Sequence, residues 1–238
     1  MVGTPKIRHM SAGHEEHHRN LSDGWVRAAV FGVSDGLVTN LSLILGFAGA
    51  NPHPATVRLA GLAGLVAGGF SMATGEYISM TAQRELFEKE IEVERKSIAE
   101  SPEDEFQELI DVFLKQGISD STARLMASEV MANPEAALRL HAREELGMDP
   151  SAIGSSWRAA SSSFIAFSLG ALVPLFPWFW PFSWSIWLSI ALGGAASLAV
   201  GAVTGIFSGR GPVRTAVRQL LVTTLAAGVT YGVGRLIG

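Results

Sequence analysis

The chain has no cysteine among its 238 residues. A disulfide framework and a metal site built from thiolates are therefore both excluded. Residues 1–25 contain no apolar stretch, so we expect no secretory signal peptide and instead a disordered polar tail. An excess of positive charge is also missing, because the formal net charge is −4. An acidic chain of this kind argues against a nucleic-acid partner.

Long apolar segments dominate what is present. Hydrophobic residues make up 48 % of the chain, and the mean hydropathy is +0.29. A membrane-spanning helix needs about 20 apolar residues. Five segments meet that length, at about 26–50, 59–82, 159–182, 184–208 and 213–237. The last is the weakest, because Arg214 and Arg218 interrupt its first turns. The sequence therefore predicts an all-α membrane protein with five transmembrane helices.

A hydrophilic insert separates the second and third spans. Residues 83–150 hold 17 acidic side chains against 8 basic ones, whereas the rest of the chain is net positive. We expect the helix of span two to continue to about Ala99, and Ser101-Pro102 and Asn133-Pro134 to begin further helices. The predicted domains are the tail (1–25), transmembrane helices one and two (26–82), an acidic helical metal-binding domain (83–150) and transmembrane helices three to five (151–238).

The distribution of basic residues predicts the orientation in the membrane. Lys and Arg gather in the N-terminal tail and in the loop at 209–213, while the loop around Pro177–Pro181 has none. Short loops rich in Lys and Arg stay on the cytoplasmic side. We therefore expect the N-terminus and the insert to be cytoplasmic.

Two acidic residues lie inside predicted spans. An ionised group in hydrocarbon costs at least a few kcal/mol unless a cavity, partner or cation compensates it, which makes Asp35 a candidate for a transport pathway. Glu76 in the second span has Met72 and Met80 on the same helix face. Carboxylates and thioethers together suit a transition metal. Thr39, one turn after Asp35, offers another oxygen, although membrane threonines often bond their own backbone. The alternative is that the methionines only pack and that Glu76 lies near the water boundary.

The insert carries a second set of candidate ligands, all carboxylates or imidazole. They are Glu94, Glu105, Glu108, His141, Glu144 and Glu145. Glu105 and Glu108, and likewise His141 and Glu145, are spaced to share a helix face. Facing helices hold metal ions with such side chains. A solvated acidic surface is the alternative for any single pair.

The motifs FGVSDGLVTNLSLILGF, AGGFSMATGEY and HAREELGMDP resemble those of the vacuolar iron transporter family and its bacterial members. The similarity covers nearly the whole chain from about His14. It implies a homodimer with five spans per subunit that moves Fe²⁺, and in some members Mn²⁺, out of the cytosol in exchange for protons. It also implies an inner (plasma) membrane location in a bacterium or a vacuolar membrane in a eukaryote.

The resemblance also implies roles for particular residues. The family's membrane acid corresponds to Asp35, its span-two methionine to Met72, and its cytoplasmic ligands to Glu94, Glu105, Glu108 and Glu145. The chain departs from the family pattern at three places, which are Ser97, His141-Ala142 and Gly64. Histidine in place of methionine keeps the site suitable for Fe²⁺, Mn²⁺, Co²⁺ or Zn²⁺.

We therefore predict a divalent metal transporter rather than an enzyme, with metal ions, protons and membrane lipid as partners and no prosthetic group. A membrane-tethered di-iron ferroxidase and a metal sensor are the rival hypotheses. The Glu-x-x-His pairs of ferritin-like sites are lacking, since no glutamate lies three residues before His141.

Overall fold

The computed structural model describes residues 24–50, 53–145, 147, 154–180 and 183–238. Within those ranges the ordered elements are all helices, and no strand occurs. The all-α prediction is therefore confirmed for the described part of the chain. The predicted disordered tail lies almost entirely outside the described residues.

Five helices are long and apolar enough to cross a membrane, as predicted. They are α1 (Trp25–Gly49), α2 (Pro54–Glu100), α6 (Ser156–Leu175), α7 (Ser185–Phe207) and α8 (Pro212–Ile237). The fifth, which the two arginines made the weakest, is a full-length helix. The third α-helix ends at Leu175, before the expected limit of 182, and the 3₁₀ turn η3 (Phe176–Phe179) follows it.

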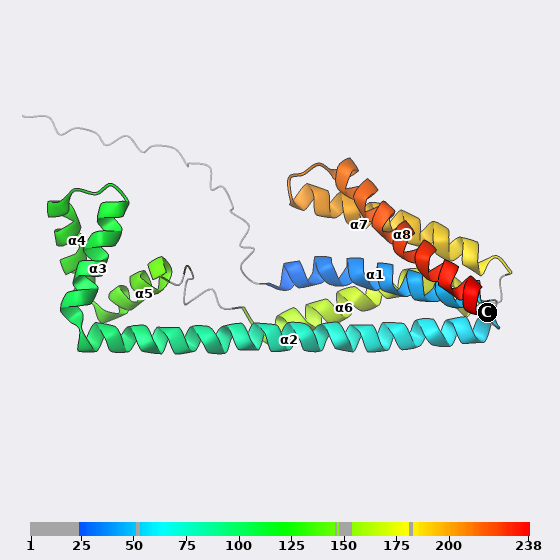
Figure 1. The fold of residues 1–238 in the computed structure, drawn as a ribbon, viewed down its shortest axis with the longest axis horizontal. Coiled ribbons are helices and arrows are strands. Elements are labelled where there is room, and N and C mark those ends of the chain that lie inside the picture. The colour runs from blue at the N-terminus through cyan, green and yellow to red at the C-terminus, as the bar shows by residue number, and fades with distance from the viewer. Residues whose placement is uncertain (1–23, 51–52, 146, 148–153, 181–182) are drawn as a thin grey trace, which may run out of the picture.

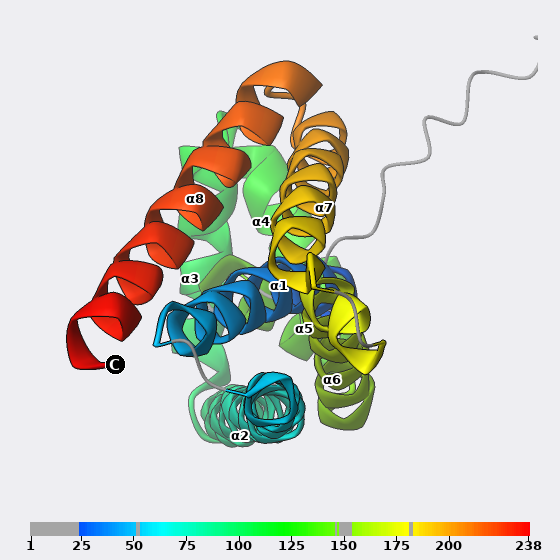
Figure 2. The same ribbon diagram turned by 90° about the vertical axis from the view of Figure 1, so that its right-hand side faces the viewer.

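Helix α1 is the centre of the membrane bundle. Figures 1 and 2 show α2 and α6 on one side of it and α7 and α8 on the other. Glycines permit the closest of these contacts: a Cβ on Gly36 would overlap the carbonyl oxygen of Phe167 on α6. Small residues allow helix backbones to approach closely in lipid, where packing drives association.

Helix α2 is much longer than a membrane span. Its 47 residues run without a break, and at 1.5 Å per residue they measure about 70 Å. The three helices α3 (Pro102–Lys115), α4 (Asp120–Met131) and α5 (Pro134–Glu145) gather at its far end, away from the other spans (Figure 1). The predicted continuation of span two into the insert is therefore confirmed.

The helices of the insert pack around a small apolar core. Leu109, Ile110 and Phe113 of α3 meet Ala123 and Ala127 of α4. This core orients α3, and with it the acidic first turn of that helix.

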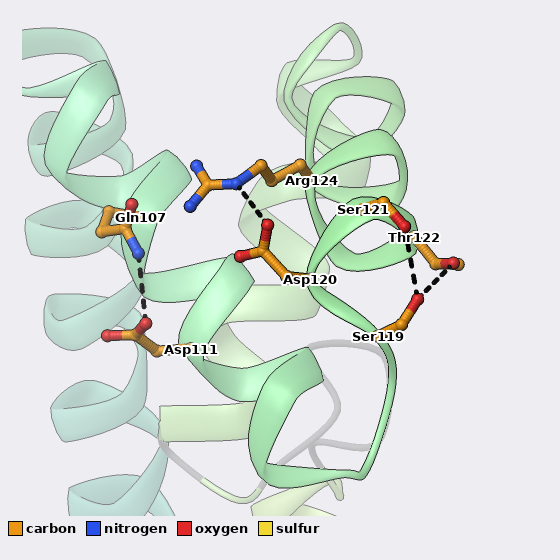
Figure 3. Close-up of polar contacts among 7 residues, drawn as sticks. All are labelled: Gln107, Asp111, Ser119, Asp120, Ser121, Thr122 and Arg124. Carbon is orange, nitrogen blue, oxygen red and sulfur yellow. Dashed lines mark hydrogen bonds and ion pairs between the residues drawn. The ribbon is translucent and has the colours of Figure 1, made fainter.

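Local signals set the turns between these helices. Gly117 ends α3 with a positive φ of 88°. The next helix begins after Ser119, whose hydroxyl bonds those of Ser121 and Thr122 (Figure 3). Asn133 caps α5 as predicted, because its side-chain oxygen accepts hydrogen bonds from the amides of Glu135 and Ala136.

Candidate metal centre

Three helices of the insert bring together one ligand cluster, consisting of Glu94 on α2, Glu105 on α3 and His141 on α5. Their side chains are buried, with residue exposures of 9 %, 7 % and 2 % respectively. The Nδ1 atom of His141 lies 3.3 Å from Glu94 Oε1 and 3.3 Å from Glu105 Oε2. One ligand atom from each of the three lies within 4.8 Å of the others.

The surrounding sequence explains why these polar groups are buried. Glu105 stands one turn before Leu109, so the helix face that packs into the insert core also carries the carboxylate. His141 lies between Leu138 and Ala142, which are buried as well. Burying two carboxylates side by side is costly unless a positive group or a cation compensates them.

Burial changes the proton affinities of the cluster. It raises the pKa of Glu105, an effect that the His141 ring opposes and that the neighbouring charge of Glu108 reinforces. Burial lowers the pKa of His141, and the negative charges of Glu105 and Glu108 offset part of this change. A lowered pKa keeps the imidazole neutral at neutral pH, which is the form that binds a metal.

The donor set suits a borderline divalent ion. Two carboxylate oxygens and one imidazole nitrogen favour Fe²⁺, Mn²⁺, Co²⁺ or Zn²⁺ over ions that prefer thiolates. Three protein ligands also leave coordination positions for water, so that an ion can enter and leave without dismantling the site.

Two of the other predicted ligands of the insert, Glu108 and Glu144, lie outside this cluster. Glu108 is exposed on α3, although it is near enough to raise the pKa of Glu105. Glu144 is exposed and accepts a hydrogen bond from Gln116 Nε2 at 3.4 Å. Glu145 ends α5, and its side chain lies outside the described residues.

The predicted membrane acid lies on a partly open face of α1. Asp35 is half-buried and accepts a hydrogen bond from the hydroxyl of Thr39 at 3.3 Å. Phe31, one turn before Asp35, is 63 % exposed, and Thr39 is exposed as well. These three residues follow one face at i, i+4 spacing. No other helix of the described chain covers that face fully.

Glu76 on α2 forms an ion pair with Arg27 on α1. The Nη2 atom of Arg27 lies 2.8 Å from Glu76 Oε1, and the glutamate side chain is 17 % exposed while the arginine is 71 % exposed. Met72 and Met80, which flank Glu76 on its helix face, are half-buried. Sequence reasoning did not foresee the partner, because it depends on the register between α1 and α2.

That register also places Asp35. Helices α1 and α2 are antiparallel: Arg27 faces Glu76, and Asn40 faces Gly64. By interpolation Asp35 lies near the level of Gly68. Met72 is then about 6 Å and Glu76 about 12 Å farther along the helix axis. The geometry therefore brings Asp35 closer in depth to Met72 than to Glu76.

Comparison with known proteins identifies the family. The sequence model of the VIT family matches residues 26–235. The chain belongs to the VIT family. It is 33 % identical over 225 residues to the vacuolar iron transporter of Acanthamoeba castellanii, covering 93 % of this chain and 82 % of that protein. It is 28 % identical over 236 residues to vacuolar iron transporter 1 of Tulipa gesneriana, covering 98 % and 95 %.

A third relative within the VIT family is vacuolar iron transporter 2 of Oryza sativa subsp. japonica, 30 % identical over 226 residues. The match covers 94 % of this chain and 92 % of that protein. These relatives come from plants and an amoeba, and the expectation of a bacterial-type member is not borne out. The predicted family itself is confirmed.

Proposed function

We propose that this VIT-family chain carries Fe²⁺ across a membrane, from the side of the insert to the opposite side, in exchange for protons. The relatives named above are vacuolar iron transporters. The observation that most supports the proposal is the buried cluster of Glu94, Glu105 and His141, because it is built onto a helix that continues into the membrane. Mn²⁺ is the expected second substrate, since the same donors suit it.

The insert collects the ion in this proposal. Its surplus of acidic side chains raises the local concentration of cations, and the ligand cluster holds one of them in exchange for the protons of its carboxylates. The exposed carboxylates of Glu108 and Glu144 lie at the surface near α3, where an arriving ion meets them first. Glu145 is the last residue of α5 and follows Glu144 directly.

The membrane step uses Asp35, Thr39 and Met72, with Glu76 and Met80 nearer the start of α1. The hydroxyl of Thr39 already points at the Asp35 carboxylate, so the two oxygens can face one ion. Glu76 is held by Arg27, which an entering cation must displace. A divalent ion favours the ionised carboxylate and loss of the ion favours protonation, which couples metal movement to protons.

A homodimer is consistent with the exposed face of α1. Asp35 and Thr39 would otherwise face lipid, which is expensive for a carboxylate. A second copy placed against Phe31, Asp35 and Thr39 would cover them and bring two carboxylates to one axis.

Excess basic charge in the tail and in the loop at 209–213 supports a cytoplasmic insert.

Transport into vesicles tests the proposal. Purified protein in proteoliposomes, under anaerobic conditions, should take up Fe²⁺ when the vesicle lumen is more acidic than the medium, because protons leave as Fe²⁺ enters. Dyes for pH and for metal record both ions. Asp35→Asn should abolish uptake and leave metal binding by the insert intact. Asp111→Asn is the matched control, because Asp111 is an exposed carboxylate of α3 that accepts a hydrogen bond from Gln107 (Figure 3).

The rival functions give different results in the same vesicles. A ferroxidase would convert Fe²⁺ to Fe³⁺ in air, but the ligand cluster offers three side chains, fewer than the six of a ferritin-like di-iron site. A sensor would bind metal and move none. Uptake that persists at full rate in Asp35→Asn would reject the proposed route.

A further inference from the structure

Helix α8 carries two charged side chains that the proposed transport leaves without a role. Arg214 and Arg218 stand one turn apart near its start, and both are exposed. Neither is in an ion pair with any residue of the chain that the structure describes. An arginine in a membrane-spanning helix is costly unless it reaches a partner. A compensating group is therefore expected next to them.

The two arginines begin a continuous outward face of α8. The opposite, inward face packs on α7, where a Cβ on Gly201 would overlap the Cα of Ala216. Helical spacing aligns the arginines with three apolar side chains farther along α8, which are 53 to 69 % exposed. We call this set the α8 outer face, and its members are Arg214, Arg218, Leu221, Val222 and Leu225.

The charges of the membrane bundle do not compensate these arginines. Residues 151–238, which contain α6, α7 and α8, hold five arginines and no aspartate, glutamate or lysine. In the membrane-spanning parts of α1 and α2, Glu76 is paired with Arg27, and Asp35 accepts a hydrogen bond from Thr39. The compensating anion therefore comes from outside the bundle.

We propose that the α8 outer face binds one phospholipid with an anionic headgroup. The 26 residues of α8 measure about 39 Å, against about 30 Å for the hydrocarbon core, so about three residues at each end lie outside it. Arg218 therefore starts inside the hydrocarbon. Side chains of a helix lean toward its N-terminus, so both guanidiniums reach back to the headgroups. Their planar forks match phosphate oxygens, and an acyl chain follows Leu221 and Leu225.

Charge complementarity selects this occupant over two others. Unpaired arginines attract a net negative headgroup, whereas the phosphate of a zwitterionic lipid is already neutralised by its own ammonium. A second copy of the chain would bring the same patch of both subunits together across a twofold axis, which sets arginines against arginines. Figure 1 shows α8 starting at the end of the bundle that faces the insert. In the proposed orientation this is the cytoplasmic leaflet, where anionic lipids are concentrated.

A lipid on the α8 outer face acts on the neighbourhood of the membrane acid. Gln219, which follows Arg218, donates from Nε2 to the hydroxyl of Ser34 on α1 at 2.7 Å. Ser34 directly precedes Asp35. A headgroup that holds Arg218 at one depth therefore also fixes the depth of α8 against the part of α1 that carries Asp35.

Native mass spectrometry of the full-length protein in detergent, with no metal added, tests this proposal separately from transport. Phosphatidylglycerol and phosphatidylcholine with the same acyl chains are titrated in turn. The parent should bind phosphatidylglycerol more tightly than phosphatidylcholine. The double variant Arg214→Gln/Arg218→Gln should weaken phosphatidylglycerol about 25-fold, since each basic side chain at a membrane surface contributes about fivefold to the affinity for anionic lipid. It should leave phosphatidylcholine unchanged.

Arg139→Gln is the matched control, because Arg139 is an exposed arginine on α5 of the insert. It should leave both lipid affinities unchanged. Arg214→Lys/Arg218→Lys keeps both charges and should bind phosphatidylglycerol more tightly than the glutamine variant, which separates loss of charge from misfolding. Equal affinity of the parent for the two lipids, undiminished phosphatidylglycerol binding by the glutamine variant, or a lysine variant as weak as the glutamine one would overturn the proposal. A parent dimer that the glutamine variant dissociates would overturn it too, by assigning this face to a second copy.

Discussion

Removing the charge of Glu105 should stabilise the insert and at the same time weaken its metal binding. Glu105 shares a buried site with Glu94, and the ligand atoms lie within 4.8 Å of each other. Burial disfavours the ionised form of Glu105, and the charge of Glu108 adds to this effect, while His141 and Glu94 offset part of it. The metal-free insert therefore carries a strain that a bound cation relieves.

The sign follows from the pKa of Glu105. Burial raises it, so the folded state binds the proton more tightly than the unfolded state does. Stability is then lost as the pH rises through the folded pKa, and each pKa unit corresponds to about 1.4 kcal/mol. Glu105→Gln keeps the shape and removes the charge. We expect it to stabilise the metal-free insert at pH 7 by about 1 kcal/mol, after the loss of the 3.3 Å contact between Glu105 Oε2 and the His141 ring is deducted.

The same substitution, Glu105→Gln, should lower the affinity of the insert for metal. Loss of an outer-shell partner alone lowers affinity about 10- to 100-fold, so loss of a direct carboxylate ligand should cost at least about 100-fold. Hydrogen exchange of α3 and α5 amides in the full chain measures the stability of the insert, and titration with Co²⁺ measures its affinity. Glu129→Gln, an exposed charge on α4, is the control. Should Glu105→Gln lower protection without metal, the carboxylate would be a structural anchor rather than a strained ligand.

Three further outcomes are expected. Metal affinity should fall as the pH drops below neutrality, because protons compete with the metal for His141 and Glu105. Burial lowers the pKa of His141 and raises the pKa of Glu105, so the loss should fall between the ordinary imidazole and carboxyl pKa values. Co²⁺ titrations from pH 7.5 to 5 measure it. Gly36→Ala should disrupt the bundle by colliding with the Phe167 carbonyl, while Gly75→Ala, which meets nothing within 4 Å, should be tolerated or stabilise by about 0.5–1 kcal/mol; thermal unfolding in detergent separates the two. Arg27→Gln should lower the KM for Fe²⁺ uptake several-fold, because it releases Glu76 for the cation; an unchanged KM would remove Arg27 from the entry step.

Local sequence signals predicted most of the fold. Apolar length identified all five spans. Asn133 marks the start of α5 and Gly117 follows the end of α3, both as expected, because helix capping depends on neighbouring residues alone. The predicted third span, 159–182, extends past the end of α6 at Leu175, because apolar composition continues beyond Pro174. The predicted loop around Pro177–Pro181 does overlap the turn at Phe176–Phe179.

The candidate site was predictable only in part. Carboxylates with histidine in the insert were recognisable, but which three converge depends on how α2, α3 and α5 cross. Glu144, one turn from His141, bonds Gln116 instead of joining the cluster. The Arg27–Glu76 pair depends likewise on the register of two antiparallel helices, which a single sequence does not contain.

The length of α2 limits how the insert can serve a membrane pathway. Glu94 and Glu76 lie 18 positions apart on one uninterrupted helix, which corresponds to about 27 Å. No side chain bridges that distance, so an ion cannot be handed directly from the ligand cluster to the membrane acids. Under the proposed function, the insert would therefore serve transport by holding metal at raised concentration near the entrance, with the carboxylates of Glu85 and Glu90 on the stretch of α2 between the two sites. Uptake by Glu105→Gln should accordingly approach the parent rate at saturating Fe²⁺ and fall behind at low Fe²⁺, whereas a direct relay would lose rate at every concentration.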